Sequence, residues 1–159
     1  MLLEGQEAKM SPEVFREMCE SGLSGVLRQA ALAMLDGADA PHPFVRAWRD
    51  ADAQVRNAIA AERARKRGLP AAQTPRLDAS GCDASIPPAI AAAFALPDPL
   101  SRERAIAHVR WTILDQLQGV DPLSENVVLA FAAKLKINTL LLSADPSKGA
   151  ESFKAITTR

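Results

Sequence analysis

The most regular pattern in the chain is an apolar stripe that runs from Pro43 to Arg67. Its positions recur every three or four residues, which is the spacing of one face of an α-helix. The stripe consists of Phe44, Trp48, Ala51, Val55 and Ile59, and Glu62 continues the spacing. Proline suits the first turn of a helix, and Gly68 suits a left-handed cap after its end. The pattern predicts one long amphipathic helix of roughly 36 Å, at about 1.5 Å per residue.

Two shorter helices are predicted before it. Ser11-Pro12-Glu13 is typical of a helix start, because serine can accept a hydrogen bond from a free backbone amide and proline has no amide to leave unpaired. Gly22 ends this helix, and Ser24 or Gly25 begins a second one that ends at Asp36-Gly37. We expect the two to pack as a short hairpin. The apolar positions are Val14, Phe15 and Met18 in the first helix, and Leu27, Ala31, Met34 and Leu35 in the second.

The same start signal occurs twice in the C-terminal half, as Asp98-Pro99-Leu100-Ser101 and Asp121-Pro122-Leu123-Ser124. Each predicts a long helix, and the turn at Gly119 to Asp121 predicts that the two pack antiparallel. A last short helix at 148–156 is expected to lay Phe153 and Ile156 on the core. The predicted buried positions are Ile106, Val109, Ile113 and Leu117 in the first long helix, and Val128, Phe131, Leu135 and Leu142 in the second.

The segment 69–88 has no apolar period, so we expect a long exposed connection or a mobile flap, followed by a brief helix at 89–96. The chain is 48% apolar but only 4% aromatic, which favours helix over sheet. Its 159 residues suit a single helical domain, 1–159. The sequence therefore predicts an all-α fold: an irregular helical bundle with one long amphipathic helix and a C-terminal antiparallel helix pair.

Charge narrows the classes of partner. The formal net charge is zero, which does not favour binding to nucleic acid as a whole-molecule effect. Residues 1–39 hold seven acidic and three basic side chains, whereas residues 46–67 hold seven basic and three acidic ones. The apolar run 127–142 is interrupted by Lys134, Lys136 and Asn138, and Glu4 follows the first three residues directly. We therefore expect no membrane-inserted helix, no signal peptide and a cytoplasmic protein.

Candidate chemistry is sparse. The sequence contains no phosphate-binding glycine loop, no HExxH helix and no calcium-loop spacing, so no catalytic, cofactor-binding or metal-ligating residue is predicted. His42, between two prolines, is interpreted as a loop residue, and His108 as a partly buried helix residue. Cys19 and Cys82 are interpreted as reduced thiols. A small helical enzyme stays open as an alternative, with a pocket around His108, Trp111 and Asp115.

Several segments carry a family resemblance. They are Pro43–Arg49, Val55–Ala60 and Arg63–Gly68, then Asp98–Leu100, Arg110-Trp111 and Leu114-Asp115, then 127–142 followed by Gly149 and Phe153, and near the start Met1–Gly5 and Ser11–Phe15. In this order they resemble an uncharacterised bacterial family encoded beside V-type ATPase subunits. In that family, the sequence of the long helix contains a tryptophan followed, in this order, by the fragments LRN, LA and LRA, then by a lysine and a glycine. Because these are helix-packing patterns, the resemblance implies no catalytic signature.

The resemblance implies a non-catalytic accessory or coupling subunit of a bacterial V-type ATPase, between the central stalk and the membrane rotor. V-type ATPase subunits are the expected partners, and self-association is left open. On this hypothesis the long helix is the interface, through Arg56, Arg63, Arg65, Lys66 and Arg67. The simpler interpretation is that these cations only solubilise the helix. Nucleic acid is not expected, because no aromatic side chains alternate with them. A free-standing helical adaptor is the other alternative.

Overall fold

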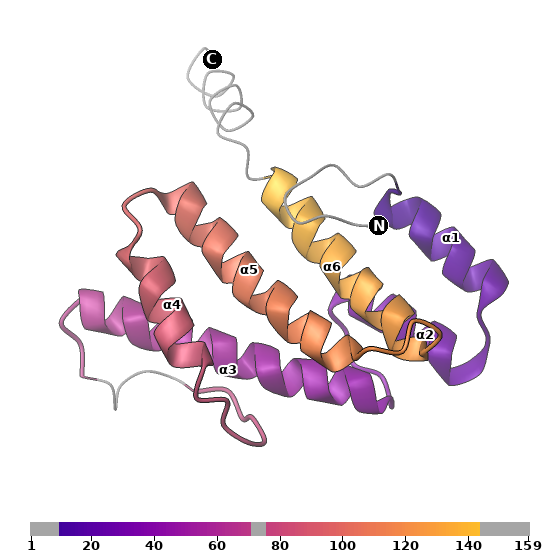
Figure 1. The fold of residues 1–159 in the computed structure, drawn as a ribbon, viewed down its shortest axis with the longest axis horizontal. Coiled ribbons are helices and arrows are strands. Elements are labelled where there is room, and N and C mark those ends of the chain that lie inside the picture. Colours follow the sequence, from indigo (N-terminus) through magenta and orange to yellow (C-terminus); the bar gives the residue numbers. More distant parts are fainter. Residues whose placement is uncertain (1–9, 71–75, 144–159) are drawn as a thin grey trace, which may run out of the picture.

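The computed structural model describes residues 10–70 and 76–143, and this part of the chain forms six α-helices (Figure 1). They are α1 (Pro12–Gly22), α2 (Gly25–Asp36), α3 (Pro43–Lys66), α4 (Ile86–Ala95), α5 (Pro99–Gln118) and α6 (Glu125–Ser143). The predicted all-α bundle with one long helix and a C-terminal antiparallel pair is confirmed. The helix expected at 148–156, with Phe153 and Ile156, lies outside the described residues.

The first two helices form where the sequence predicts them, but of the three predicted apolar positions of α1 only Phe15 is buried. Phe15 and Cys19 are buried, whereas Val14 and Met18 are 47% and 54% exposed. Steps of four residues keep side chains on one side of a helix, so burial of Phe15 and Cys19 turns Val14 and Met18 toward solvent. The choice of face comes from packing, because α1 contacts α6 as well as α2 and the rings of Phe15 and Phe131 lie 5.3 Å apart.

The long helix α3 begins and ends close to the predicted residues. His42 is its N-cap, and the ring Nδ1 accepts a hydrogen bond of 3.1 Å from the backbone N–H of Phe44. At the other end Gly68 adopts a φ of +68°, in the left-handed region that glycine tolerates. The buried face is wider than the predicted stripe, because α3 packs against α2, α4, α5 and α6. The buried residues are Phe44, Val45, Asp52, Ala53, Val55, Ile59 and Ala64.

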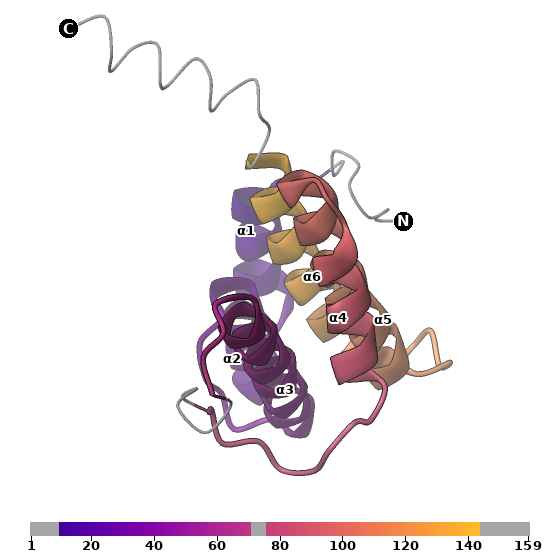
Figure 2. The same cartoon turned by 90° about the vertical axis from the view of Figure 1, so that its left-hand side faces the viewer.

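The predicted connection at 69–88 is too long, since α4 begins at Ile86. Pro87 and Pro88 lie in the first turn of α4, where a missing N–H has no helical partner to lose. The described part of the connection is also fixed to α3 and runs below it in both views (Figure 2). The side-chain amide of Asn57 donates to the Leu77 carbonyl at 2.9 Å and accepts from the Leu77 N–H at 2.8 Å. This part of the connection is therefore exposed but anchored.

The two identical start signals behave differently. Asp98 caps α5 as predicted, accepting a 2.6 Å hydrogen bond from the Ser101 N–H. Asp121 instead accepts from the Leu123 N–H, two residues ahead, at 2.9 Å. This closes a turn, and α6 begins only at Glu125, after the second signal rather than within it. Helices α5 and α6 still run side by side in opposite directions (Figure 1).

The apolar core has two parts that meet at Trp48 and Leu117. One part joins α1, α2 and α6 to the start of α3 and includes Leu114 of α5, and the other joins the rest of α3 to α4 and α5. Most of the predicted core positions of α5 and α6 lie within or against these clusters. Leu142 is an exception at 37% exposed, in the last turn of α6.

Helix α6 is the one described helix that is long and apolar enough to span a membrane by length and composition. In the bundle it packs against α2 and α5. Its inward residues Leu129, Ala130, Ala132, Ala133 and Leu135 are among the most buried in the first core cluster. A buried core helix can be as long and as apolar as a helix that spans a membrane.

Candidate partner interface

The structure divides the five predicted interface cations into two groups. Arg56 and Arg65 are engaged within α3 itself. The Arg56 Nε lies 2.7 Å from Oδ2 of Asp52, and an Arg65 terminal nitrogen lies 2.7 Å from Oε2 of Glu62. Hydrogen bonding to Glu62 raises the pKa of Arg65 further. These two side chains are therefore already paired and contribute less free positive charge to a partner.

The other three cations, Arg63, Lys66 and Arg67, line one pocket of about 220 Å³. Arg102 of α5 and Phe94 of α4 line the same pocket, together with Glu103. We call this set the basic pocket. Sequence reasoning missed Arg102, because it lies far along the chain and only the reversal through α4 brings it to the end of α3. Its place four residues after the Asp98 cap gave no signal of its own.

Two of the cations are held in place by uncharged groups. The Lys66 Nζ donates to the backbone carbonyl of Phe94 at 2.8 Å and lies 5.4 Å from the centre of the Phe94 ring. A terminal nitrogen of Arg102 donates to the carbonyl of Leu96 at 3.1 Å, and its guanidinium lies 5.4 Å from the same ring. Carbonyls and an aromatic face position these cations without cancelling their charge. The basic pocket is therefore ordered and still positive.

Arg63 and Arg67 face solvent at the rim of the basic pocket. Within the part of the chain that the structure describes, neither forms an ion pair. Both lie at the C-terminal end of α3, where the helix dipole favours cations. Glu103 is the one acidic residue among the residues that line the pocket, against four basic ones. The pocket thus carries a local excess of positive charge in a chain whose net charge is zero.

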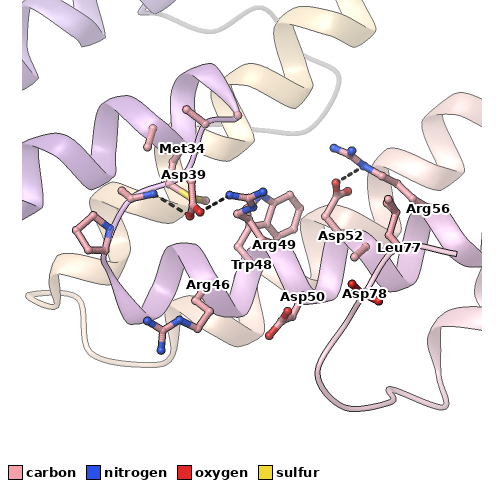
Figure 3. Close-up of a pocket in the computed structure, with 16 residues that line it drawn as sticks. Met34, Asp39, Arg46, Trp48, Arg49, Asp50, Asp52, Arg56, Leu77 and Asp78 are labelled. Atoms are coloured by element: carbon pink, nitrogen blue, oxygen red, sulfur yellow. Dashed lines mark hydrogen bonds and ion pairs between the residues drawn. The ribbon is translucent and has the colours of Figure 1, made fainter.

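A larger cavity of about 760 Å³ lies between the α2–α3 corner, α3 and the anchored connection (Figure 3). Its charged side chains are mostly paired with one another. Figure 3 shows Arg49 reaching Asp39 and Arg56 reaching Asp52, each at 2.7 Å. Asp52 also accepts from Arg110 of α5 at 2.8 Å. Two ion pairs therefore lie along this cavity, while Arg46 and Asp78, which also line it, form no ion pair among the described residues.

Of the three residues of the alternative enzyme site, Trp111 is buried, whereas His108 and Asp115 are exposed. His108 is exposed rather than partly buried, although Trp111, three residues further along α5, is buried. Asp115 pairs with Lys134 of α6, whose Nζ lies 5.5 Å from the centre of the Trp111 ring.

The other candidate residues have structural surroundings. His42 is the N-cap of α3. Cys19 is buried, which raises the pKa of its thiol, and Cys82 is exposed. No three His, Cys, Asp or Glu side chains within 10–70 and 76–143 are grouped closely enough to hold a metal ion.

Comparison with known proteins adds no relative. No family model matches the chain, and neither a curated protein nor a solved structure matches it. The resemblance to the V-type ATPase-associated family therefore rests on the sequence segments quoted above.

Proposed function

We propose that this chain is a non-catalytic helical docking protein that binds an acidic surface of a partner through the basic end of α3. The observation that carries the proposal is the basic pocket: Arg63, Lys66, Arg67 and Arg102 gather there against the single acid Glu103. Two of these cations are held by backbone carbonyls and the Phe94 ring, so little ordering is needed when a partner arrives. Charge complementarity of this kind orients a partner and speeds association.

The resemblance points to V-type ATPase subunits as the partner. On this proposal the chain acts as an accessory or coupling subunit between central stalk and membrane rotor, in the cytoplasm and peripheral to the membrane. The helical framework suits such a role, because α3 carries the basic residues on a helix that packs against four other helices. A force applied at Arg63 or Arg67 is therefore passed to the bundle rather than to a loose arm.

The test is co-purification from native membranes, followed by direct binding to the recovered partner. The double variant R63E/R67E reverses two exposed charges at the rim of the basic pocket. The matched control, R28E/R104E, reverses two exposed arginines on α2 and α5 outside the pocket. We expect wild type and control to recover V-type ATPase subunits, and R63E/R67E to lose them. Binding should also weaken as salt is raised, because exposed charges are screened.

Other outcomes separate the alternatives. Recovery of a different acidic protein, lost only in R63E/R67E, would favour the free-standing adaptor over the ATPase subunit. Equal recovery of one partner by both double variants would mean that the basic end of α3 is not the interface.

A further inference from the structure

Arg102, which lines the basic pocket, has one buried side-chain donor without a hydrogen bond. The Arg102 Nε is buried, and among side-chain nitrogens and oxygens of the described residues it is the one buried atom with no hydrogen bond. A terminal nitrogen of the same guanidinium donates to Leu96, so the side chain is held while its Nε–H stays unused. Buried donors of charged groups are normally satisfied, and an exception calls for an explanation such as an absent ligand.

The surroundings of Arg102 favour an anion. Lys66 and Arg102 both lie against the Phe94 ring, and Arg63 and Arg67 also line the basic pocket. Four cations and one carboxylate leave a positive excess around a space of about 220 Å³. Since a water molecule occupies roughly 30 Å³ in the liquid, this space can hold a small polyatomic anion together with some water.

The type of anion follows from the donors. Arg102 can offer its unused Nε–H, and its guanidinium has further N–H donors besides the one given to Leu96, which suits the oxygens of a carboxylate or phosphate. Arg63, Lys66 and Arg67 add further donors from α3. A carboxylate has two oxygens and one charge, whereas a phosphate monoester has three terminal oxygens and close to two charges at neutral pH. The number and spread of the cations therefore suit the phosphate better.

The first turn of α5 adds a favourable field but not the ligands. Arg102 is the fourth residue of α5, near the positive end of the helix dipole. The Ser101 N–H, however, is already occupied by the carboxylate of Asp98. Recognition would therefore come from the side chains of the basic pocket.

We propose that the basic pocket is a binding site for the phosphate group of a phosphate monoester, with Arg102 as the central ligand. The site goes beyond the docking proposal, because it needs no protein partner. It shares Arg63 and Arg67 with the docking surface, so an occupied pocket would present less positive charge to an acidic partner. The phosphate can be carried by a soluble molecule or by a lipid headgroup, since both offer the same oxygens.

The experiment observes the Arg102 Nε–H signal by NMR while inorganic phosphate is added to the full chain. Chloride at matched ionic strength serves as the reference. We expect a saturable shift of the Arg102 signal with phosphate and little shift with chloride. R63Q removes an exposed rim cation without touching Phe94 or Leu96, so it should fold and weaken phosphate binding several-fold. R104Q, the same change on α5 outside the pocket, should leave it unchanged.

Two further arms complete the test. R102K keeps the charge but removes the Nε donor; with the backbone amide signals around the basic pocket as the readout, it should weaken phosphate binding more than R104Q does. Binding to phosphatidylcholine vesicles with and without phosphatidic acid distinguishes the two sources of phosphate. Binding that depends on phosphatidic acid and that R63Q weakens indicates a lipid headgroup. A phosphate-induced shift without any vesicle binding indicates a soluble ligand. The proposal is overturned if phosphate and chloride shift the Arg102 signal equally, or if R63Q and R104Q bind phosphate alike.

Discussion

Arg110 of α5 donates from its Nε to Oδ1 of Asp52 on α3, at 2.8 Å. The second carboxylate oxygen of Asp52 is 2.7 Å from the Nε of Arg56, one turn further along α3. Asp52 is only 8% exposed, so a buried carboxylate joins two neighbouring helices and is neutralised from both sides. The ion pair with Arg110 thus ties α3 to α5 beside the larger cavity, which Asp52 lines.

Removing this carboxylate should cost much of the chain's stability. We expect D52N to lower the free energy of unfolding by about 3 kcal/mol, because Arg110 is left without its charge partner in a partly dry site. Urea unfolding followed by circular dichroism measures the change. D78N is the matched control, an exposed aspartate lining the same cavity, and it should leave stability nearly unchanged. An equal loss in both variants would contradict the bridging role of Asp52.

Lys134 and Asp115 form an asymmetric pair, and the two partners should respond differently to mutation. The side chain of Lys134 is 10% exposed, whereas that of Asp115 is 59% exposed. D115A strands a buried ammonium group and should destabilise the fold by roughly 2 kcal/mol. K134M leaves only a solvated carboxylate and fills the space over Trp111, so its cost should stay within about 1 kcal/mol. Thermal unfolding measures the loss of stability in both variants. A larger loss for K134M than for D115A would contradict this prediction.

Two glycines should give opposite results when changed to alanine. Gly37 ends α2 with a φ of +75°, and an added Cβ would lie 2.3 Å from the Lys136 Nζ. We expect G37A to destabilise by about 1–2 kcal/mol, because alanine rarely adopts this backbone conformation. Gly22 is the last residue of α1 and has nothing within 4 Å of an added Cβ. G22A should be neutral or stabilising by about 0.5 kcal/mol. Chemical unfolding of the two variants tests the contrast, and similar losses would contradict it.

The cap of α5 should make stability fall in acid. Hydrogen bonds from the Ser101 side chain and backbone N–H lower the pKa of Asp98 below its ordinary value. A carboxyl with a lower pKa in the folded state contributes stability above its unfolded pKa of about 3.9, and loses it as the pH falls through the folded pKa. D98N can still cap the helix but does not titrate. The advantage of wild type over D98N, measured by urea unfolding, should therefore shrink between about pH 5 and pH 3. A constant difference would exclude this contribution.

Local signals in the sequence were enough for most of the helices. Ser11, Asp98 and the Gly68 cap depend on backbone groups within a few residues, so their roles can be read without knowing the fold. The stripe from Phe44 to Ile59 likewise determined that α3 is long and amphipathic. The all-α class and the antiparallel pair of α5 and α6 followed from these elements and from the short turn between them.

Local signals were not enough where a neighbour decides the outcome. The Asp121 signal repeats the Asp98 tetrapeptide, yet its side chain closes a turn and α6 starts later. Segment 76–85 looked unstructured because its anchors, such as Asn57, lie on another element. The sequence predicts Val14, Phe15 and Met18 on the buried side of α1, but contact with α6 selects the face of Phe15 and leaves the other two exposed.

The candidate site shows the same division. The sequence by itself determined that Arg63, Lys66 and Arg67 cluster at the end of a helix, because they lie within two turns of α3. The pairs of Arg56 with Asp52 and of Arg65 with Glu62 are local too, because each joins residues four or three apart on α3. Only the tertiary structure decided that Asp52 is buried and paired with Arg110, and that Arg102 joins the basic pocket. The physical reason is that helix formation and ion pairs within one helix depend on neighbours in sequence, whereas burial and ion pairs between helices depend on which helices pack together.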